Sequence, residues 1–257
     1  MGTVVTIDIR DDIDPDAVEA AIDHLHTVDD RFSLWKPESE LSLLARGDLA
    51  LEDCHPDVAD VLGLCEALRR DSGGAFDARR HRRDGRLDPT GIVKGWSVDG
   101  AARILEAAGA RSYAIAAGGD VLAIGEPEPG RPWRVGIRHP DRPDRVAAVL
   151  GVRDLAVATS ATYERGGHLV DPRAAGGPTP VRPFRSVTVT GPTLTWADAY
   201  ATTAFVMGEP GIAWVDAHPG SGILVITDDD RVRWTAAVAR LRAGLDSTSR
   251  PTSGVAG

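Results

Sequence analysis

Basic side chains are in the minority in this chain, which has 29 Lys and Arg residues against 38 Asp and Glu residues and a formal net charge of −9. Lys36 and Lys94 are its only lysines, and it contains no Asn or Gln. A general nucleic-acid-binding protein needs a basic surface that displaces counterions from phosphates, so this class is disfavoured. If an acidic protein of this kind handles a phosphate ester, we expect it to recruit a metal ion.

Cysteine and long apolar runs are also scarce. Cys54 and Cys65 are the only cysteines, a number that fits neither a zinc site nor a disulfide framework, so we expect both to be reduced and structural. No apolar run reaches the ~18 residues that a membrane-spanning helix needs. The opening MGTVVTIDIR lacks a basic segment followed by an apolar one and lacks a lipobox cysteine. We therefore expect a cytoplasmic protein, although removal of an export segment before residue 1 would give the same sequence.

The remaining composition, 42% hydrophobic and 26% charged, is typical of a soluble globular chain. At ~150 residues per domain the length allows one or two domains. We find no internal repeat and no linker in the middle of the chain. The sequence therefore predicts one domain over residues 1–240 and a flexible tail over 241–257, where small and polar residues gather.

Hydrophobic periodicity predicts consecutive strands interrupted by helices. The expected helices open at Asp14-Pro15 and cover about 56–68, 95–108, 196–206 and 210–217. The expected strands cover 3–9, 113–117, 121–124, 133–137, 146–152, 155–159, 186–189, 223–227 and 232–235. Strict alternation of strand and helix is missing, so the pattern favours an α+β fold with a largely antiparallel sheet and packed helices over a doubly wound fold.

The densest polar motif runs from Asp88 to Gly95. It places a carboxylate, a Pro/Gly turn and Lys94 just before the expected helix. Because the first N–H groups of a helix carry partial positive charge, this is a candidate phosphate site. The alternative is a simple strand–turn–helix connection with a capping aspartate.

Three further motifs have both a chemical and a plain structural interpretation. Gly118-Gly119-Asp120 allows close approach of a ligand or is an ordinary turn. His168 and Asp171 lie in a Gly-flanked segment, where a histidine can accept a proton or simply be a loop residue. Asp198 and Thr202 are four residues apart on a helix, so their oxygens share a face and suit Mg²⁺, unless they form an exposed polar pair.

In this order the motifs resemble those of the FAD:protein FMN transferases, the ApbE family. The resemblance extends from Met1 to about Thr235, although Trp35 stands where the family usually has Tyr. The matching segments are Met1-Gly2-Thr3, Phe32 to Pro37 with Ser39-Glu40-Leu41, Gly74-Ala75-Phe76-Asp77, Asp88 to Gly95 with Trp96 and Asp99, Gly118-Gly119-Asp120, Trp133 with Pro140, Ser160 with Tyr163-Glu164-Arg165, His168 to Pro172, and Ala197-Asp198 with Thr202.

The resemblance implies an ApbE-like fold, related to the T-fold, with FAD as a substrate in a central cleft. The isoalloxazine would lie near Met1 and Trp35. Mg²⁺ would be held by the main-chain carbonyl of Gly91 and the side chains of Asp198 and Thr202. Further FAD contacts would come from Ala75, Phe76, Asp77, Asp88, Lys94, Gly119, Asp120 and His168.

The implied reaction is attack by a threonine hydroxyl of an acceptor protein on the FMN-side phosphorus of FAD, with release of AMP. A neutral imidazole suits the required base, so His168 is the candidate, and Asp171 would orient its loop or ring. A Mg²⁺-dependent FAD pyrophosphatase would use the same motifs, and a non-catalytic FAD-binding protein is a further alternative. The protein would act as a monomer or a homodimer.

Overall fold

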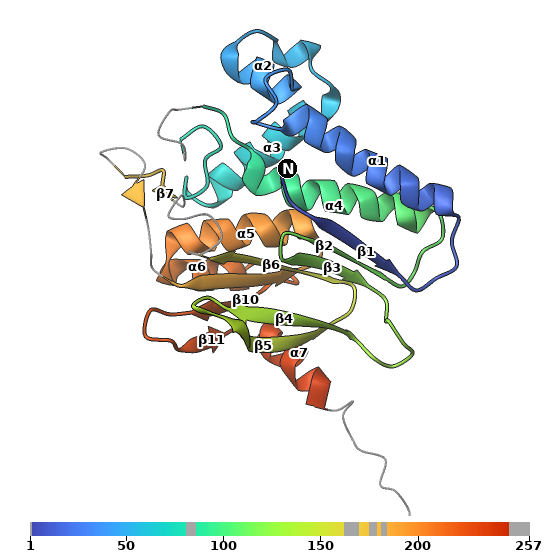
Figure 1. Ribbon diagram of the computed structural model, residues 1–257. Coiled ribbons are helices and arrows are strands. Elements are labelled where there is room, and N and C mark those ends of the chain that lie inside the picture. Colours follow the sequence, from blue (N-terminus) through green and yellow to red (C-terminus); the bar gives the residue numbers. More distant parts are fainter. Residues whose placement is uncertain (1, 81–85, 162–169, 175–178, 181–183, 247–257) are drawn as a thin grey trace, which may run out of the picture.

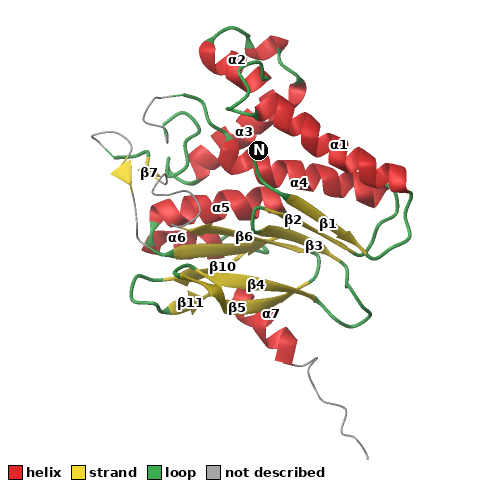
Figure 2. Ribbon diagram, viewed as in Figure 1, coloured by secondary structure: helices red, strands yellow, loops and turns green. Residues whose placement is uncertain are grey.

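The computed structural model describes residues 2–80, 86–161, 170–174, 179–180 and 184–246. Its main feature is a seven-stranded antiparallel sheet in the order β1-β2-β3-β6-β9-β10-β11. Most helices lie on one side of this sheet, and the β4–β5 ribbon with α7 lies on the other (Figure 1, Figure 2). The expected α+β class with a largely antiparallel sheet is confirmed.

The bounds of the elements follow the chain order. The helices are α1 (Pro15–Phe32), α2 (Glu40–Arg46), a short 3₁₀ helix (Leu51–Asp53), α3 (Pro56–Asp71), α4 (Thr90–Ala107), α5 (Leu194–Met207), α6 (Glu209–Asp216) and α7 (Ala236–Asp246). The strands are β1 (Val5–Ile9), β2 (Tyr113–Ala117), β3 (Asp120–Ile124), β4 (Trp133–His139), β5 (Arg142–Val152), β6 (Leu155–Ala161), β7 (Val170–Asp171), β8 (Thr179–Pro180), β9 (Ser186–Gly191), β10 (Gly222–Ile226) and β11 (Val232–Trp234).

Alternating side chains give the sheet two apolar faces, as expected for strands with period two. The helical face carries the largest core cluster, which includes Leu105, Ile115, Val189 and Phe205. The opposite face packs Leu150 of the ribbon and Val238 of α7 against Leu224, among others. A further cluster joins the end of α1 to α2, α3 and the first turn of α4. Both faces of the sheet are therefore covered.

Most expected strands and helices lie where periodicity places them, but three helices differ. α4 begins at Thr90, five residues before the expected start at 95. α2 was not expected, although Ser39 accepts a hydrogen bond from Ser42 N as its N-cap and Gly47 ends it in the left-handed conformation. α7 was not expected either; the domain boundary expected at residue 240 lies inside it, and Leu241 packs against the sheet.

The early start of α4 has a packing explanation. Gly91 and Gly95 resemble turn signals in the sequence, yet both lie inside the helix. A Cβ on Gly91 would lie 2.9 Å from the Phe76 ring, and a Cβ on Gly95 would lie 2.3 Å from the carbonyl oxygen of Leu194. These glycines are therefore required by close neighbours, and tertiary packing overrides their low helix propensity.

Asp99 completes the contact between α4 and α5. Its two carboxylate oxygens accept hydrogen bonds from Leu194 N at 2.9 Å and Thr195 N at 2.8 Å. These are N–H groups of the first turn of α5, which have no partner within their own helix. A carboxylate at a helix N-terminus also complements the helix dipole. Gly95 and Asp99, one helical turn apart, together fix the start of α5 on α4.

Replacing Gly95 by alanine should therefore lower the free energy of unfolding by about 3 kcal/mol, because the new methyl group meets backbone atoms that cannot move alone. The matched control is Gly63→Ala in α3, where a Cβ has no heavy atom within 4 Å. That change should stabilise the protein by about 0.5–1 kcal/mol through helix propensity. Chemical denaturation of both variants measures the difference, and equal stabilities would contradict the close-contact role of Gly95.

Candidate functional site

Lys94 joins two buried carboxylates at the centre of the candidate site. Its Nζ forms an ion pair with Asp120 Oδ2 and lies 3.4 Å from Asp198 Oδ1. The exposed fraction is 1% for Asp120 and 5% for Asp198. The three side chains come from α4, β3 and α5, so the fold brings together residues that are far apart in the sequence. Carboxylates buried this deeply need a compensating cation.

Asp120 is held on its other side by the sheet. It begins β3 directly after the Gly118–Gly119 turn, and its Oδ1 accepts a hydrogen bond from Thr159 N at 2.9 Å. Both glycines have positive φ, +59° and +95°, as a tight two-residue hairpin turn requires. The turn thus fixes where Asp120 starts, and β6 fixes the orientation of its carboxylate.

Asp198 and Thr202 share one face of α5, as their spacing predicts. The hydroxyl of Thr202 lies 3.0 Å from Ser160 Oγ on β6. Asp198 is buried, so the alternative interpretation of the pair as an exposed polar face is wrong. The carboxylate and the hydroxyl instead lie between α5, α4 and the sheet.

The start of the chain adjoins the Gly118–Gly119 turn. Gly118 N donates to Val4 O at 3.4 Å, and a Cβ on Gly118 would lie 2.6 Å from Thr3 Oγ1. The residues around Thr3 are thus next to the turn that positions Asp120. Met1, expected near the isoalloxazine, lies outside the described residues.

The start of α4 differs from the expected phosphate site. Pro89 is the N-cap residue of α4, and the preceding Asp88 accepts hydrogen bonds through Oδ1 from Thr90 N at 3.0 Å and from Thr90 Oγ1 at 2.6 Å. Lys94 lies in the second turn and not before the helix. Asp88 thus binds the first residue of the helix, as the structural alternative expects of an aspartate at this connection, and its role towards FAD stays a prediction. The side chain of Lys94 approaches the carboxylates of Asp120 and Asp198.

Gly91 lies at the same end of the α4–α5 contact as Asp198. On α4, Lys94 lies more than one turn before Asp99; on α5, Asp198 lies one turn after Leu194. Asp99 binds the amide of Leu194, and Lys94 approaches Asp198. The two helices therefore run past each other in opposite directions. Gly91, nearly one further turn towards the start of α4, belongs to the same end as Asp198.

The segment Ala75–Phe76–Asp77 supports the first turn of α4 through its side chains. Ala75 and Phe76 are buried, and the Phe76 ring faces Gly91. Asp77 Oδ1 accepts hydrogen bonds from Arg79 N at 2.8 Å and Arg80 N at 3.2 Å. Phe76 therefore connects this loop to the first turn of α4. The role of the loop towards FAD stays a prediction.

Trp35 is an exposed aromatic residue in the connection between α1 and α2. Its exposed fraction is 90%, which leaves nearly the whole indole accessible. The neighbouring end of α1 packs on the first half of α4, because the Phe32 and Trp96 rings lie 5.9 Å apart. Among the described residues we find no contact between Trp35 and Lys94, Asp120 or Asp198, so its proximity to a flavin stays a prediction.

Asp171 is held by Arg173, a partner that the sequence analysis did not identify. The guanidinium donates to its carboxylate from Nε at 2.8 Å and from Nη2 at 2.9 Å. These hydrogen bonds lower the pKa of Asp171 below its usual value, so the carboxylate is ionised at neutral pH. A Cβ on Gly74 would lie 3.7 Å from Arg173 Cγ, which places β7 beside the 74–77 loop. His168 lies outside the described residues.

Sequence reasoning also missed the partners supplied by β6. Thr159 contributes its backbone amide to Asp120, and no side-chain pattern signals such a contact. Ser160 was noted only as part of a family motif, and its contact with Thr202 depends on how α5 lies on the sheet. Both become visible only once the strand order is known.

A second acidic group lies away from Lys94. His139, Asp141 and Asp230 have potential ligand atoms within 4.8 Å of one another. Arg142 Nη2 already lies 2.6 Å from Asp230 Oδ2, and Arg185 forms an ion pair with Asp141. Arginine guanidinium groups thus balance these carboxylates, and the group forms a surface ion-pair network.

Among the described residues, no helix is both long and apolar enough to cross a bilayer.

Curated proteins match part of this chain. The FAD:protein FMN transferase of Rhodobacter capsulatus is 37% identical over 170 residues, which cover 63% of this chain and 31% of that protein. The FAD:protein FMN transferase of Vibrio cholerae is 34% identical over 154 residues, which cover 56% of this chain and 46% of that protein. The matched part of the chain thus spans less than half the length of these curated relatives.

Solved structures match over nearly the whole chain. The flavin transferase ApbE from Vibrio cholerae superposes with a TM-score of 0.78 at 25% identity, covering 94% of this chain and 96% of that one. The ApbE protein of Thermotoga maritima shares the fold, with a TM-score of 0.78 at 22% identity over 93% of this chain and 95% of that one. A family model described as the ApbE family matches residues 1–82 and 78–225. The chain therefore belongs to the ApbE family.

Proposed function

We propose that this protein is an FAD:protein FMN transferase that moves FMN from FAD to a threonine hydroxyl of an acceptor protein. The observation that carries the proposal is the buried group of Lys94, Asp120 and Asp198, with the Thr202 hydroxyl on the same helix face as Asp198. The relatives named above as FAD:protein FMN transferases support the same activity. The overall transfer forms a bond from the threonine oxygen to the FMN phosphorus and breaks the bond from that phosphorus to the oxygen of AMP.

The donor set fits a hard cation such as Mg²⁺. A carboxylate from Asp198, a hydroxyl from Thr202 and the main-chain carbonyl of Gly91 are oxygen ligands of the kind that Mg²⁺ prefers. The exposed fraction of Asp198 is 5%, so little solvent reaches its charge, and a cation beside it would add to the compensation that Lys94 provides from 3.4 Å. When bound there, Mg²⁺ would offset charge on the pyrophosphate and stabilise the leaving oxygen of AMP.

Lys94 contributes positive charge at the candidate site of a chain whose net charge is −9. Asp120 anchors its ammonium group, and Thr159 N in turn anchors Asp120. In the proposal, Lys94 lies close enough to the pyrophosphate to interact with it. Asp88 keeps the first turn of α4 ordered, which keeps Gly91 and Lys94 in position.

The acceptor hydroxyl must lose its proton during transfer. We assign this step to His168, whose neutral imidazole suits a general base near pH 7. Asp171 is ionised and held by Arg173. In the proposal, Asp171 orients the loop or the ring of His168. Trp35, Met1, Ala75, Phe76, Asp77 and Gly119 complete the proposed surroundings of FAD.

The direct experiment incubates the protein with FAD, Mg²⁺ and an acceptor domain that contains the target threonine. Mass spectrometry should show the acceptor gaining the mass of FMN, and chromatography should show one AMP per modified acceptor. AMP formed at the same rate without acceptor, and no mass gain, would instead indicate an FAD pyrophosphatase. FAD that stays intact throughout would indicate a flavin-binding protein without turnover.

Asp198→Ala should abolish Mg²⁺-dependent AMP release, with a loss of about 100-fold or more, because a proposed direct metal ligand is removed. Asp216→Ala on the exposed surface of α6 is the matched control and should keep full activity. Circular dichroism of both variants verifies the fold. Unchanged activity of a folded Asp198→Ala protein would rule out the metal assignment.

Thr202→Val keeps the shape of the side chain and removes only its hydroxyl. We expect the Mg²⁺ concentration for half-maximal activity to rise about tenfold, since one oxygen ligand is lost while Asp198 remains. The rate at saturating Mg²⁺ should fall less than it does in Asp198→Ala. A titration that matches the unsubstituted protein would show that Thr202 does not contribute to metal binding.

His168→Ala should slow FMN transfer more than it weakens FAD binding, because a general base acts in the chemical step. Losses of about 100-fold in rate are typical of such residues. FAD affinity is measured by fluorescence titration and transfer by the mass of the acceptor. Equal losses in both measurements would make His168 a binding residue.

A further inference from the structure

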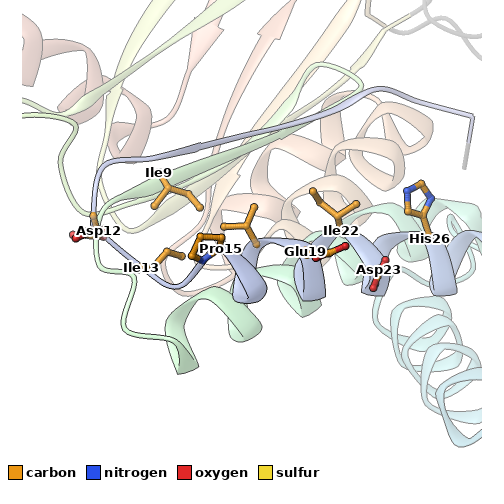
Figure 3. A pocket seen from close by; sticks show the side chains of 10 residues that line it. Ile9, Asp12, Ile13, Pro15, Glu19, Ile22, Asp23 and His26 are labelled. Atoms are coloured by element: carbon orange, nitrogen blue, oxygen red, sulfur yellow. The ribbon is translucent and has the colours of Figure 1, made fainter.

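A groove of about 690 Å³ runs between β1 and α1, away from the Lys94 group. Figure 3 shows Ile9 from the strand, Ile13 from the connection that follows it, and Pro15 and Ile22 from the helix. Val18 of α1 also lines it. Ile22 is 41% exposed. Five of the ten lining residues are thus aliphatic, and the other five are Asp11, Asp12, Glu19, Asp23 and His26.

The strand beside the groove is the outermost strand of the sheet. Among the described residues, β1 pairs only with β2. Arg10 N donates to Ser112 O at 2.9 Å, and Val4 O accepts from Gly118 N. Arg10 with Ser112 and Val4 with Gly118 are therefore hydrogen-bonded pairs. Hydrogen-bonded and non-hydrogen-bonded pairs alternate in an antiparallel ladder, so the pairs between these two alternate in the same way.

This alternation defines which backbone groups face outward. Val5, Ile7 and Ile9 occupy the non-bonded positions opposite β2, so their N–H and C=O groups point to the free edge. Their side chains pack against the helical core cluster. A row of such outward groups is a template for another strand. A segment added here would lay every second side chain over the groove.

The rim of the groove is acidic. Asp12, Glu19 and Asp23 line it, and all three are exposed. None of these carboxylates forms an ion pair or a side-chain hydrogen bond within the part of the chain that the structure describes. A second copy of the same surface would bring like charges together, and an anionic lipid or nucleic acid would be repelled. The rim favours a cationic partner.

We propose that the β1–α1 groove binds an extended, cationic segment of a partner protein, which pairs with the free edge of β1. Its apolar side chains lie over Val18 and Ile22, and its basic side chains reach Glu19 and Asp23. Backbone pairing supplies affinity, and the alternating apolar and basic side chains supply selectivity. This interaction is independent of the proposed flavin transfer.

The test uses a blocked, fluorescent eight-residue peptide whose alternate positions are arginine, isoleucine, isoleucine and arginine, with threonine between them. We expect saturable binding by fluorescence anisotropy. A peptide with glutamate in place of arginine should bind roughly tenfold or more weakly. Methylating the backbone nitrogens of the two isoleucines in one peptide, and of the inner threonines in another, removes either set of pairing N–H groups. At least one of these peptides should lose binding.

The protein variant Glu19→Lys/Asp23→Lys reverses the charge of the rim on the helix. It should weaken binding of the arginine peptide roughly tenfold and improve binding of the glutamate peptide. The matched control, Glu52→Lys/Asp60→Lys, changes two exposed acidic residues outside the groove and should leave affinity unchanged. Both variants alter net charge equally, so the comparison separates local from overall electrostatics.

Amide hydrogen exchange identifies the strand edge. Binding should slow exchange at Val5, Ile7 and Ile9, whose N–H groups face outward, and should leave Thr6 and Asp8 nearly unchanged. Equal affinity for the two peptides, equal effects of the two double variants, or protection elsewhere would overturn the proposal. Peptide-independent dimerisation through β1, seen by sedimentation, would assign this edge to a second copy and also overturn it.

Discussion

The contact between α4 and α5 is the constraint on which the candidate site depends. Gly95 brings the two helices close enough for the carbonyl of Leu194 to occupy the space of a side chain, and Asp99 binds the amides that begin α5. A shift of α5 along α4 by one turn, about 5.4 Å, would separate Asp198 from Lys94. Gly95 and the carboxylate of Asp99 therefore affect more than the stability of their own helices. They determine where the carboxylate and hydroxyl of α5 lie.

The sheet provides the second half of this constraint. The Gly118–Gly119 turn starts β3 at Asp120, and β6 orients the Asp120 carboxylate through Thr159 N. Lys94 then connects the helical layer to the sheet, since its ammonium group approaches carboxylates from both. The site consequently lies between the helical layer and the sheet. The helical layer positions Asp198, and the sheet positions Asp120.

Sequence periodicity predicted most of the sheet because strand alternation is a local property; β2, for example, covers the expected residues 113–117. It failed at the start of α4 because Gly91 and Gly95 are explained only by residues distant in sequence, Phe76 and Leu194. The spacing of Asp198 and Thr202 correctly indicated a shared helix face, while their burial depended on tertiary packing. The Lys94–Asp120 pair was unpredictable for the same reason, because it requires the position of β3 under α4.

Stability alone does not account for the Lys94 group. Removing charges from water costs several kcal/mol per ion, and well-packed apolar residues of similar volume often stabilise a core as well or better. The chain nevertheless buries Asp120 and Asp198 between its two layers, although elsewhere most of its many carboxylates remain exposed. The proposed function gives this energetic cost a reason, because binding an anionic substrate and its cation would require oriented charges in a place from which water is largely excluded.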